Sequence, residues 1–266
     1  ARQLFCECST GKKYHLSTYM IPYDRKRILQ EIREELNRLE KDYPTYEAVP
    51  KERRITIIAT SLIEAGVDLD VYTVFRERSG LDSILQAGGR CNREGRRAIA
   101  DVFIFDFADH TRRAAVEEKG NLAKGLLEKY ADISEPSCIA EYYDTLYFMK
   151  QEEIQKNAMH KMCSKIRRLP FKEYAEKFEL IDSKTVSVVV VRDEKSRELA
   201  EHLRYTKSVN TRMLQNYVCT VYQKELENLI KQHVVEDYGT GFYCLTNLDY
   251  YDEQIGILFE ARDYFL

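Results

Sequence analysis

Residues 55–60 read Ile-Thr-Ile-Ile-Ala-Thr, a continuous run of β-branched and small apolar side chains. Such a run is typical of a strand that is buried on both faces of a parallel sheet, because a half-exposed strand alternates polar and apolar residues. Similar runs stand at 71–75 and 102–107, and a helix is predicted at about 81–86 between them. Strands that alternate with helices in this way predict an α/β domain with a mainly parallel sheet.

The chain on either side of this core extends the pattern. A short strand is predicted at 13–18 and a long amphipathic helix at about 23–39. The apolar stripe of that helix consists of Ile28, Ile32, Leu36 and Leu39. Long helical stretches rich in Lys and Glu follow from about residue 111, and a mixed region with short strands follows those. The predicted organisation is an α/β domain over 1–110, a helical linker over 111–170 and a smaller mixed α/β domain over 171–266.

The composition is that of a soluble globular protein, with 266 residues, 32% charged side chains and a net charge of only -3. This excludes bulk polycation character, so any nucleic-acid contact must come from local patches. No apolar run approaches the roughly 20 residues that cross a bilayer, so we expect no membrane partner and a cytoplasmic location. Seven scattered cysteines favour reduced thiols, and no second Cys/His pair stands at zinc-ligand spacing from Cys6 and Cys8. We therefore predict no metal site.

The residues that follow the 55–60 strand form the first candidate site. In open α/β sheets, ligands bind beyond the carboxyl ends of the strands. Thr60 and Ser61 stand there, and their hydroxyls can cap a helix or contact a phosphate. Gly66 permits a close backbone approach, and the Asp68 carboxylate can accept from a ribose hydroxyl. An ordinary strand-turn-helix with a capping threonine explains the same residues equally well.

The second candidate site is the stretch 86–93, which reads Gln-Ala-Gly-Gly-Arg-Cys-Asn-Arg. Arg90 and Arg93 are three residues apart, so both guanidinium groups can project the same way from a helix or tight turn. Two planar cations that converge on one point suit the oxygens of a phosphoryl group. A solvated basic helix end, with Arg96 and Arg97 nearby, is the alternative.

The two stretches together resemble motifs V and VI of the superfamily 2 helicases, whose last motif has the form QxxGRxxR. In that family the motif lies on the second RecA-like domain and reaches across a cleft to ATP held by the first. The resemblance implies a catalytic set of Arg93, as the arginine finger, with Arg90 and Gln86. It implies a nucleotide-contacting set of Gly66, Asp68 and Gly89. It also implies a set on the nucleic-acid track, consisting of Ser17, Thr18, Thr60 and Ser61.

A more specific resemblance, to one family of superfamily 2 helicases, is carried by four stretches. These stretches are similar to the CRISPR-associated helicase-nuclease of type I systems and comprise residues 14–25, 60–68, 80–95 and 241–258. The type I-C branch is favoured, and the similarity covers nearly the whole chain. It implies a second RecA-like domain and a C-terminal domain of a helicase that moves along single-stranded DNA. It also implies ATP and Mg²⁺ as cofactors, a divalent metal in a separate nuclease domain, and an RNA-guided CRISPR surveillance complex as partner in antiviral defence.

The sequence holds no GxxxxGK[ST] loop, no DExH or DEAD run and no His-Asp cluster of a nuclease. The apolar residues of the first helix also recur at helical spacing from residue 1, with no methionine or cap before them. We therefore expect that the chain starts inside a longer protein, without the first strand of its α/β domain, and is inactive alone. A non-catalytic DNA- or protein-binding module and another superfamily 2 helicase are the alternatives.

Overall fold

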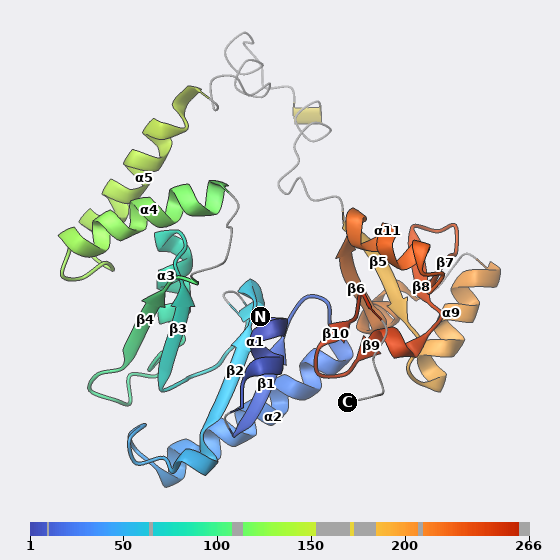
Figure 1. Ribbon diagram of the computed structural model, residues 1–266, viewed down its shortest axis with the longest axis horizontal. Helices are drawn as coiled ribbons and strands as arrows, with labels where there is room; N and C mark the ends of the chain where they lie inside the picture. The colour runs from blue at the N-terminus through green and yellow to red at the C-terminus, as the bar shows by residue number, and fades with distance from the viewer. Residues whose placement is uncertain are drawn as a thin grey trace. The chain divides into compact units, whose positions relative to one another are not determined.

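The computed structural model describes residues 1–9, 11–63, 66–107, 114–152, 171–172, 185–206 and 210–260 (Figure 1). Contacts between Cα atoms divide the chain into two compact units. Unit 1 comprises residues 1–69 and 183–266, and unit 2 comprises residues 70–182. The predicted boundaries near 110 and 170 lie outside the described residues and stay predictions.

The N-terminal part of unit 1 is built on two parallel strands and a long helix. Its elements are α1 (Arg2–Glu7), β1 (Lys12–Leu16), α2 (Pro22–Asp42), β2 (Ile55–Ala59) and the 3₁₀ turns η1 (Lys51–Arg53) and η2 (Ser61–Ile63). β1 pairs with β2 in parallel, with Leu16 opposite Ala59. Pro22 starts α2, where its missing N–H removes no helical hydrogen bond. The predicted apolar stripe of α2 is buried, which confirms the helical interpretation of this segment.

The C-terminal part of unit 1 is a four-stranded mixed sheet with helices against it. Its strands are β5 (Thr185–Val190), β6 (Val218–Tyr222), β7 (Val235–Asp237) and β8 (Phe242–Leu245), in the order β6-β5-β8-β7. Its helices are α9 (Glu194–Thr206), α10 (Thr211–Leu214), α11 (Gln223–Lys231) and the 3₁₀ turns η3 (Gln215–Tyr217) and η4 (Leu248–Tyr250). A short hairpin of β9 (Tyr251–Asp252) and β10 (Gly256–Ile257) follows. In this sheet the described strands β5 and β8 run parallel, whereas β6 and β7 are antiparallel to their neighbours, as expected of a mixed α/β unit.

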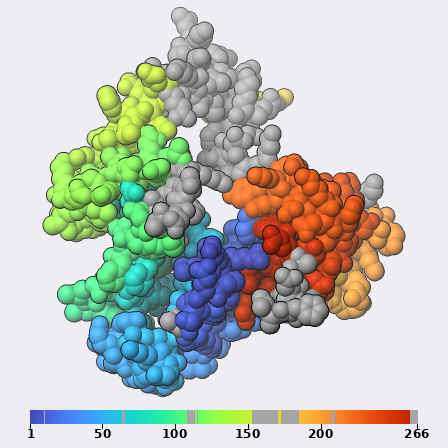
Figure 2. Space-filling model, in the orientation of Figure 1, coloured from blue at the N-terminus to red at the C-terminus, as the bar shows by residue number. Residues whose placement is uncertain are grey.

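The two parts of unit 1 share one hydrophobic core although they are distant in sequence. Ile21, at the start of α2, lies in the same buried cluster as the strands of the C-terminal sheet. Asp24 is fully buried, accepts a hydrogen bond from the Tyr251 hydroxyl at 2.7 Å and pairs with Arg192. Figure 2 shows the blue N-terminal residues in contact with the red C-terminal ones. A buried carboxylate is tolerated only when it is paired in this way, so the contact is specific.

The described residues of unit 2 form a parallel strand pair with three helices. Its elements are β3 (Thr73–Glu77), α3 (Leu81–Gly88), β4 (Asp101–Phe105), α4 (Ala114–Lys129) and α5 (Pro136–Met149). β3 pairs with β4 in parallel, with Val74 opposite Val102. Leu81 and Ile84 of α3 pack with Ala123 of α4 and Tyr142 of α5 in one buried cluster. This β-α-β order is the one that the sequence pattern predicted.

The fold class is confirmed as mixed α/β with small parallel sheets, but one detail of the prediction is wrong. Within unit 1 β1 pairs with β2, and within unit 2 β3 pairs with β4, each in parallel. The expected burial on both faces is wrong for β3 and β4, because Phe75 is 70% exposed and Phe103 is 48% exposed. These two rings stack on each other on a strand pair whose helices pack on one side. No helix that the structure describes is long and apolar enough to span a membrane.

Candidate functional site

Four of the predicted residues meet at one edge of the β1–β2 pair. The strands are parallel, so their carboxyl ends lie side by side, and the Thr60 N–H donates to the Leu16 carbonyl at 3.0 Å. Ser17 and Thr18 leave β1 at this edge, next to Thr60 and Ser61, which leave β2. The predicted nucleic-acid set is therefore brought together by the fold.

The two hydroxyls that follow β1 do different things. Ser17 is 2% exposed, and its Oγ accepts the Tyr19 N–H at 3.1 Å while its carbonyl accepts the Met20 N–H at 3.3 Å. This side chain therefore shapes the turn that leads into α2. Thr18 is exposed at the tip of that turn, where a ligand can reach it.

The two hydroxyls that follow β2 also differ. Thr60 is half-buried, and its Oγ1 is buried without a hydrogen-bond partner among the described residues. A buried hydroxyl without a partner is uncommon in folded proteins and calls for an explanation. Ser61 is exposed at the start of η2. Thr18 and Ser61 are thus the accessible hydroxyls of this edge.

Gly66 and Asp68 lie further along the same loop of unit 1. Gly66 has a φ of +74°, and no heavy atom lies within 4 Å of the position of an added Cβ. Glycine is therefore needed there for backbone conformation and not for space. Asp68 is exposed, and its backbone carbonyl accepts from Arg33 Nε at 3.3 Å.

The predicted arginine pair stands where α3 ends, in unit 2. The Gly89 N–H bonds to the Leu85 carbonyl at 2.9 Å, and the Arg90 N–H bonds to the Ala87 carbonyl at 3.0 Å. The chain then returns to the segment that precedes β3, because Val71 and Cys91 form an isolated parallel bridge. Gln86, Gly89 and Arg93 are exposed, whereas Arg90 is half-buried. Arg93 is thus the more accessible of the two guanidinium groups.

The loop that carries Arg93 is anchored by the carboxylate of Asp70. Oδ1 accepts the Arg93 N–H at 2.9 Å, and Oδ2 accepts the Glu94 N–H at 3.3 Å. Arg97 Nη1 lies 3.3 Å from the same Oδ1 in an ion pair whose side chains are only 9% and 12% exposed. Hydrogen bonds to an ionised acceptor are the strong ones, so Asp70 fixes the backbone at Arg93.

A second set of contacts closes the same loop. Asn92 Oδ1 accepts the Arg97 N–H at 2.9 Å, and Asn92 Nδ2 donates to the Arg97 carbonyl at 2.6 Å. Asn92 has a φ of +51°, which asparagine tolerates better than most residues. The Arg97 guanidinium also lies 3.9 Å from the centroid of the Tyr72 ring. Arg97 is therefore engaged in holding the loop.

Residues 3–96 match a family model described as the C-terminal part of the CRISPR-associated nuclease/helicase Cas3. A protein named CRISPR-associated nuclease/helicase Cas3 from Haloferax volcanii is 42% identical over 90 residues. One of the same name from Methanothermobacter thermautotrophicus is 34% identical over 84 residues. The predicted resemblance is confirmed. We call residues 3–96 the Cas3-like segment; no finding tests the type I-C subtype, which stays a prediction.

Solved structures show that the fold is shared beyond the Cas3-like segment. The structure of T. fusca Cas3 has a TM-score of 0.55 at 12% identity, over 91% of this chain and 33% of that one. An ATP complex of the same protein has a TM-score of 0.52 at 13% identity, with the same coverage. A CRISPR RNA-guided surveillance complex before nicking has a TM-score of 0.50 at 14% identity. The chain thus spans about a third of these structures, and the aligned segment is 8% and 10% of the two curated relatives.

The Cas3-like segment contains all ten predicted site residues, and the unit division falls within it. The residues of β1, β2 and the loop to Asp68 lie in unit 1, whereas the residues from Gln86 to Arg93 lie in unit 2. Sequence reasoning missed Asp70, Asn92 and the holding role of Arg97. The signals available were an acidic residue two positions after Asp68 and an asparagine in a turn-forming position. In the part of the chain that is described, no group of three or more His, Cys, Asp or Glu side chains is placed to hold a metal.

Proposed function

We propose that this chain is the C-terminal part of an ATP-dependent helicase and nuclease of CRISPR interference, which moves along single-stranded DNA and degrades foreign DNA in the cytoplasm. The observation that carries the proposal is that the Cas3-like segment, residues 3–96, contains every residue of the predicted motifs V and VI. Unit 1 then supplies part of the DNA track through Thr18, Thr60 and Ser61. Unit 2 supplies Arg93 to the γ-phosphate of ATP.

The residues present suit this part of an ATP site. Arg93 is exposed, and its backbone N–H donates to Asp70, so the loop position of this residue is held by a hydrogen bond to an ionised acceptor. Arginine fingers of this kind stabilise the charge that develops on a transferring phosphoryl group. When bound, ATP with Mg²⁺ supplies that phosphoryl group, whose hydrolysis drives movement. We place the P-loop that cradles the phosphates, and the nuclease metal, outside these 266 residues, so this chain alone is proposed to be inactive.

We also propose two partners for this chain, an RNA-guided CRISPR complex and single-stranded DNA. The solved relative in a surveillance complex supports an association of this chain with an RNA-guided CRISPR complex. The exposed Thr18 and Ser61 support contact with a strand backbone, because hydroxyls hold phosphates without reading bases.

The test is the ATPase rate of the helicase that contains this chain, with Arg93→Ala and the neighbouring Arg96→Ala compared. Loss of an arginine finger should lower DNA-stimulated turnover by about 10³ to 10⁵. Arg96 is exposed on the same loop but outside the motif, so its variant should turn over like the parent. Unchanged turnover in Arg93→Ala would refute the assignment, and appreciable ATPase from the 266-residue chain alone would refute its proposed dependence on a second half.

A further inference from the structure

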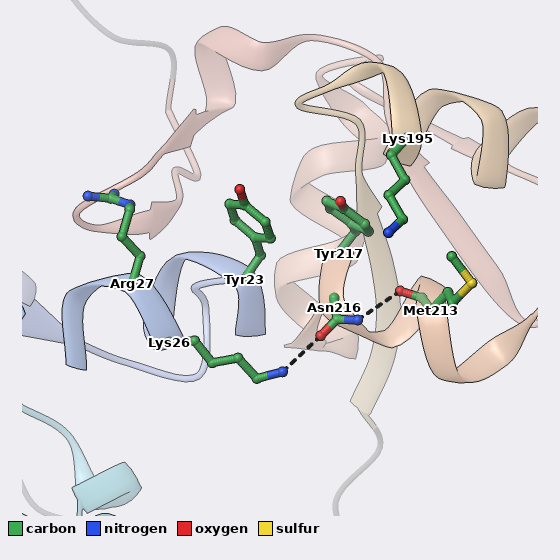
Figure 3. Close-up of a pocket in the computed structure, with 7 residues that line it drawn as sticks. All are labelled: Tyr23, Lys26, Arg27, Lys195, Met213, Asn216 and Tyr217. Atoms are coloured by element: carbon green, nitrogen blue, oxygen red, sulfur yellow. Dashed lines mark hydrogen bonds between the residues drawn. The ribbon is translucent and has the colours of Figure 1, made fainter. Parts of the chain in front are cut away.

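A pocket of about 530 Å³ opens in unit 1 where the C-terminal part packs on α2. Figure 3 shows the residues that line it. The lining residues are Tyr23, Lys26 and Arg27 from α2, Lys195 from α9, and Met213, Asn216 and Tyr217 from α10 and η3. None of them belongs to motifs V or VI. The pocket exists only because residues far apart in the sequence share one core.

An aromatic pair forms one wall of this pocket. Tyr217 is 4% exposed, and its ring stacks with that of Tyr23 at 5.8 Å between centroids and 16° between planes. The Tyr217 hydroxyl donates to Asp193 Oδ2 at 3.2 Å, and Asp193 Oδ1 accepts the Ser196 N–H at 2.7 Å. The nearby Asp193 carboxylate is thus hydrogen-bonded within the fold.

Two ammonium groups at the pocket, those of Lys26 and Lys195, have no acidic partner in the described part of the chain. Lys26 Nζ donates to Asn216 Oδ1 at 3.0 Å, and Asn216 Nδ2 donates in turn to the Met213 carbonyl at 3.2 Å. Figure 3 shows Lys195 pointing from α9 toward Tyr217 and Met213. Among the residues that the structure describes, neither lysine forms a salt bridge, and Lys26 still has two N–H groups to donate.

Arg27 differs from the two lysines. Its Nη1 lies 2.9 Å from Glu31 and its Nη2 lies 3.3 Å from Glu253, so its charge is already neutralised. Among the lining residues, Lys26 and Lys195 are therefore the cations without a salt bridge in the described part of the chain. Such a charge, beside an amide and an aromatic wall, favours an anion that carries a flat or apolar body.

We propose that this pocket binds a phosphodiester group of single-stranded nucleic acid. The inference rests on the proposed DNA track, since α2 begins directly after the turn that presents Thr18. A strand that contacts Thr18 and Ser61 continues along α2 to Lys26 and Lys195. The C-terminal part of the chain thereby gains a function, because it contributes Lys195 and Asn216 to the track.

The test measures binding of a fluorescent oligo-dT by the 266-residue chain, as anisotropy over a range of salt concentrations. Lys26→Gln and Lys195→Gln should each weaken binding at least about threefold at low salt and flatten the log-log salt slope by about 0.7, the value for one single-strand phosphate contact. Lys231→Gln is the matched control, because Lys231 is an exposed lysine of α11 without a salt bridge among the described residues. The double variant should flatten the slope twice as much.

Separate outcomes distinguish the pocket from the track. If Thr18→Val and Ser61→Ala weaken binding while the lysine variants match Lys231→Gln, the pocket inference is refuted and the track stands. If the parent chain binds no oligo-dT, both the pocket inference and the proposed DNA track are refuted. A competition arm with AMP tests a free nucleotide as the occupant. Displacement of oligo-dT by AMP at comparable affinity, lost in Lys26→Gln, would overturn the strand assignment in favour of a mononucleotide site.

Discussion

The Asp70 carboxylate accepts the backbone N–H of Arg93 at 2.9 Å, and this contact joins the segment that precedes β3 to the loop that carries the proposed arginine finger. A guanidinium contributes to catalysis when it is held where negative charge develops in the transition state. A side chain that is not held there must lose conformational entropy each time it reaches that position. We therefore propose that Asp70 is a positioning residue, which acts through the backbone of Arg93.

Replacement of Asp70 tests this role in the isolated chain. Asp70→Ala removes the acceptor of the Arg93 and Glu94 amides and the partner of Arg97. Hydrogen exchange at these two amides should become about tenfold faster, as expected from the loss of about 1 to 1.5 kcal/mol per hydrogen bond. Asp68→Ala is the control, since Asp68 is an exposed aspartate that lies two residues before Asp70 in the sequence. Equal exchange in both variants would show that Asp70 does not hold the loop.

The contact between the β9–β10 hairpin and the Thr18 turn gives a second prediction. A Cβ on Gly256 would lie 2.5 Å from the Tyr19 carbonyl atoms and 2.7 Å from Met20 N, which are backbone atoms that cannot rotate away. Gly239 has a similar positive φ of +67° but open space around its Cβ position. Gly256→Ala should therefore cost about 1 to 3 kcal/mol more unfolding free energy than Gly239→Ala, because only it adds a clash. Denaturant unfolding measures both, and equal losses would contradict the packing of this hairpin on the turn.

His15 gives a pH prediction. Its side chain is 2% exposed, and burial lowers its pKa below the ordinary value of 6.5, although the hydrogen bond of Nδ1 to the Gln254 carbonyl opposes the shift. The unfolded chain therefore binds a proton at a higher pH than the folded one. The stability that neutral His15 contributes is complete above pH 6.5 and is lost as the pH falls toward the lowered folded pKa.

The measurement is the unfolding free energy of unit 1 at pH 7.5 and 5.5. The parent should lose stability over this interval, and His15→Phe should lose less, whatever its stability at pH 7.5. His202→Gln is the control, because His202 is an exposed histidine of α9. An identical pH dependence in His15→Phe and the parent would show that His15 does not titrate between the two states.

Local sequence determined the types of the elements. Ile28, Ile32, Leu36 and Leu39 specify the buried face of α2 because helical periodicity depends only on neighbours in the chain. The strand at 55–60 was predicted in the same way, and the motif at 86–93 identified the arginine loop and, through it, the resemblance to helicases. The residue pattern of a strand does not report whether other elements cover both of its faces. For this reason the burial of Phe75 and Phe103 was predicted wrongly.

Only the tertiary structure decided which side chains of these motifs are accessible and which residues support them. Ser17 and Thr18 are adjacent in sequence, yet the turn buries the first and exposes the second. Asp70 meets the Arg93 loop across 23 residues, and Lys26 meets Asn216 across 190. Such pairs carry no periodic signal, because they depend on how separate segments pack into a shared core and not on the order of residues along one element.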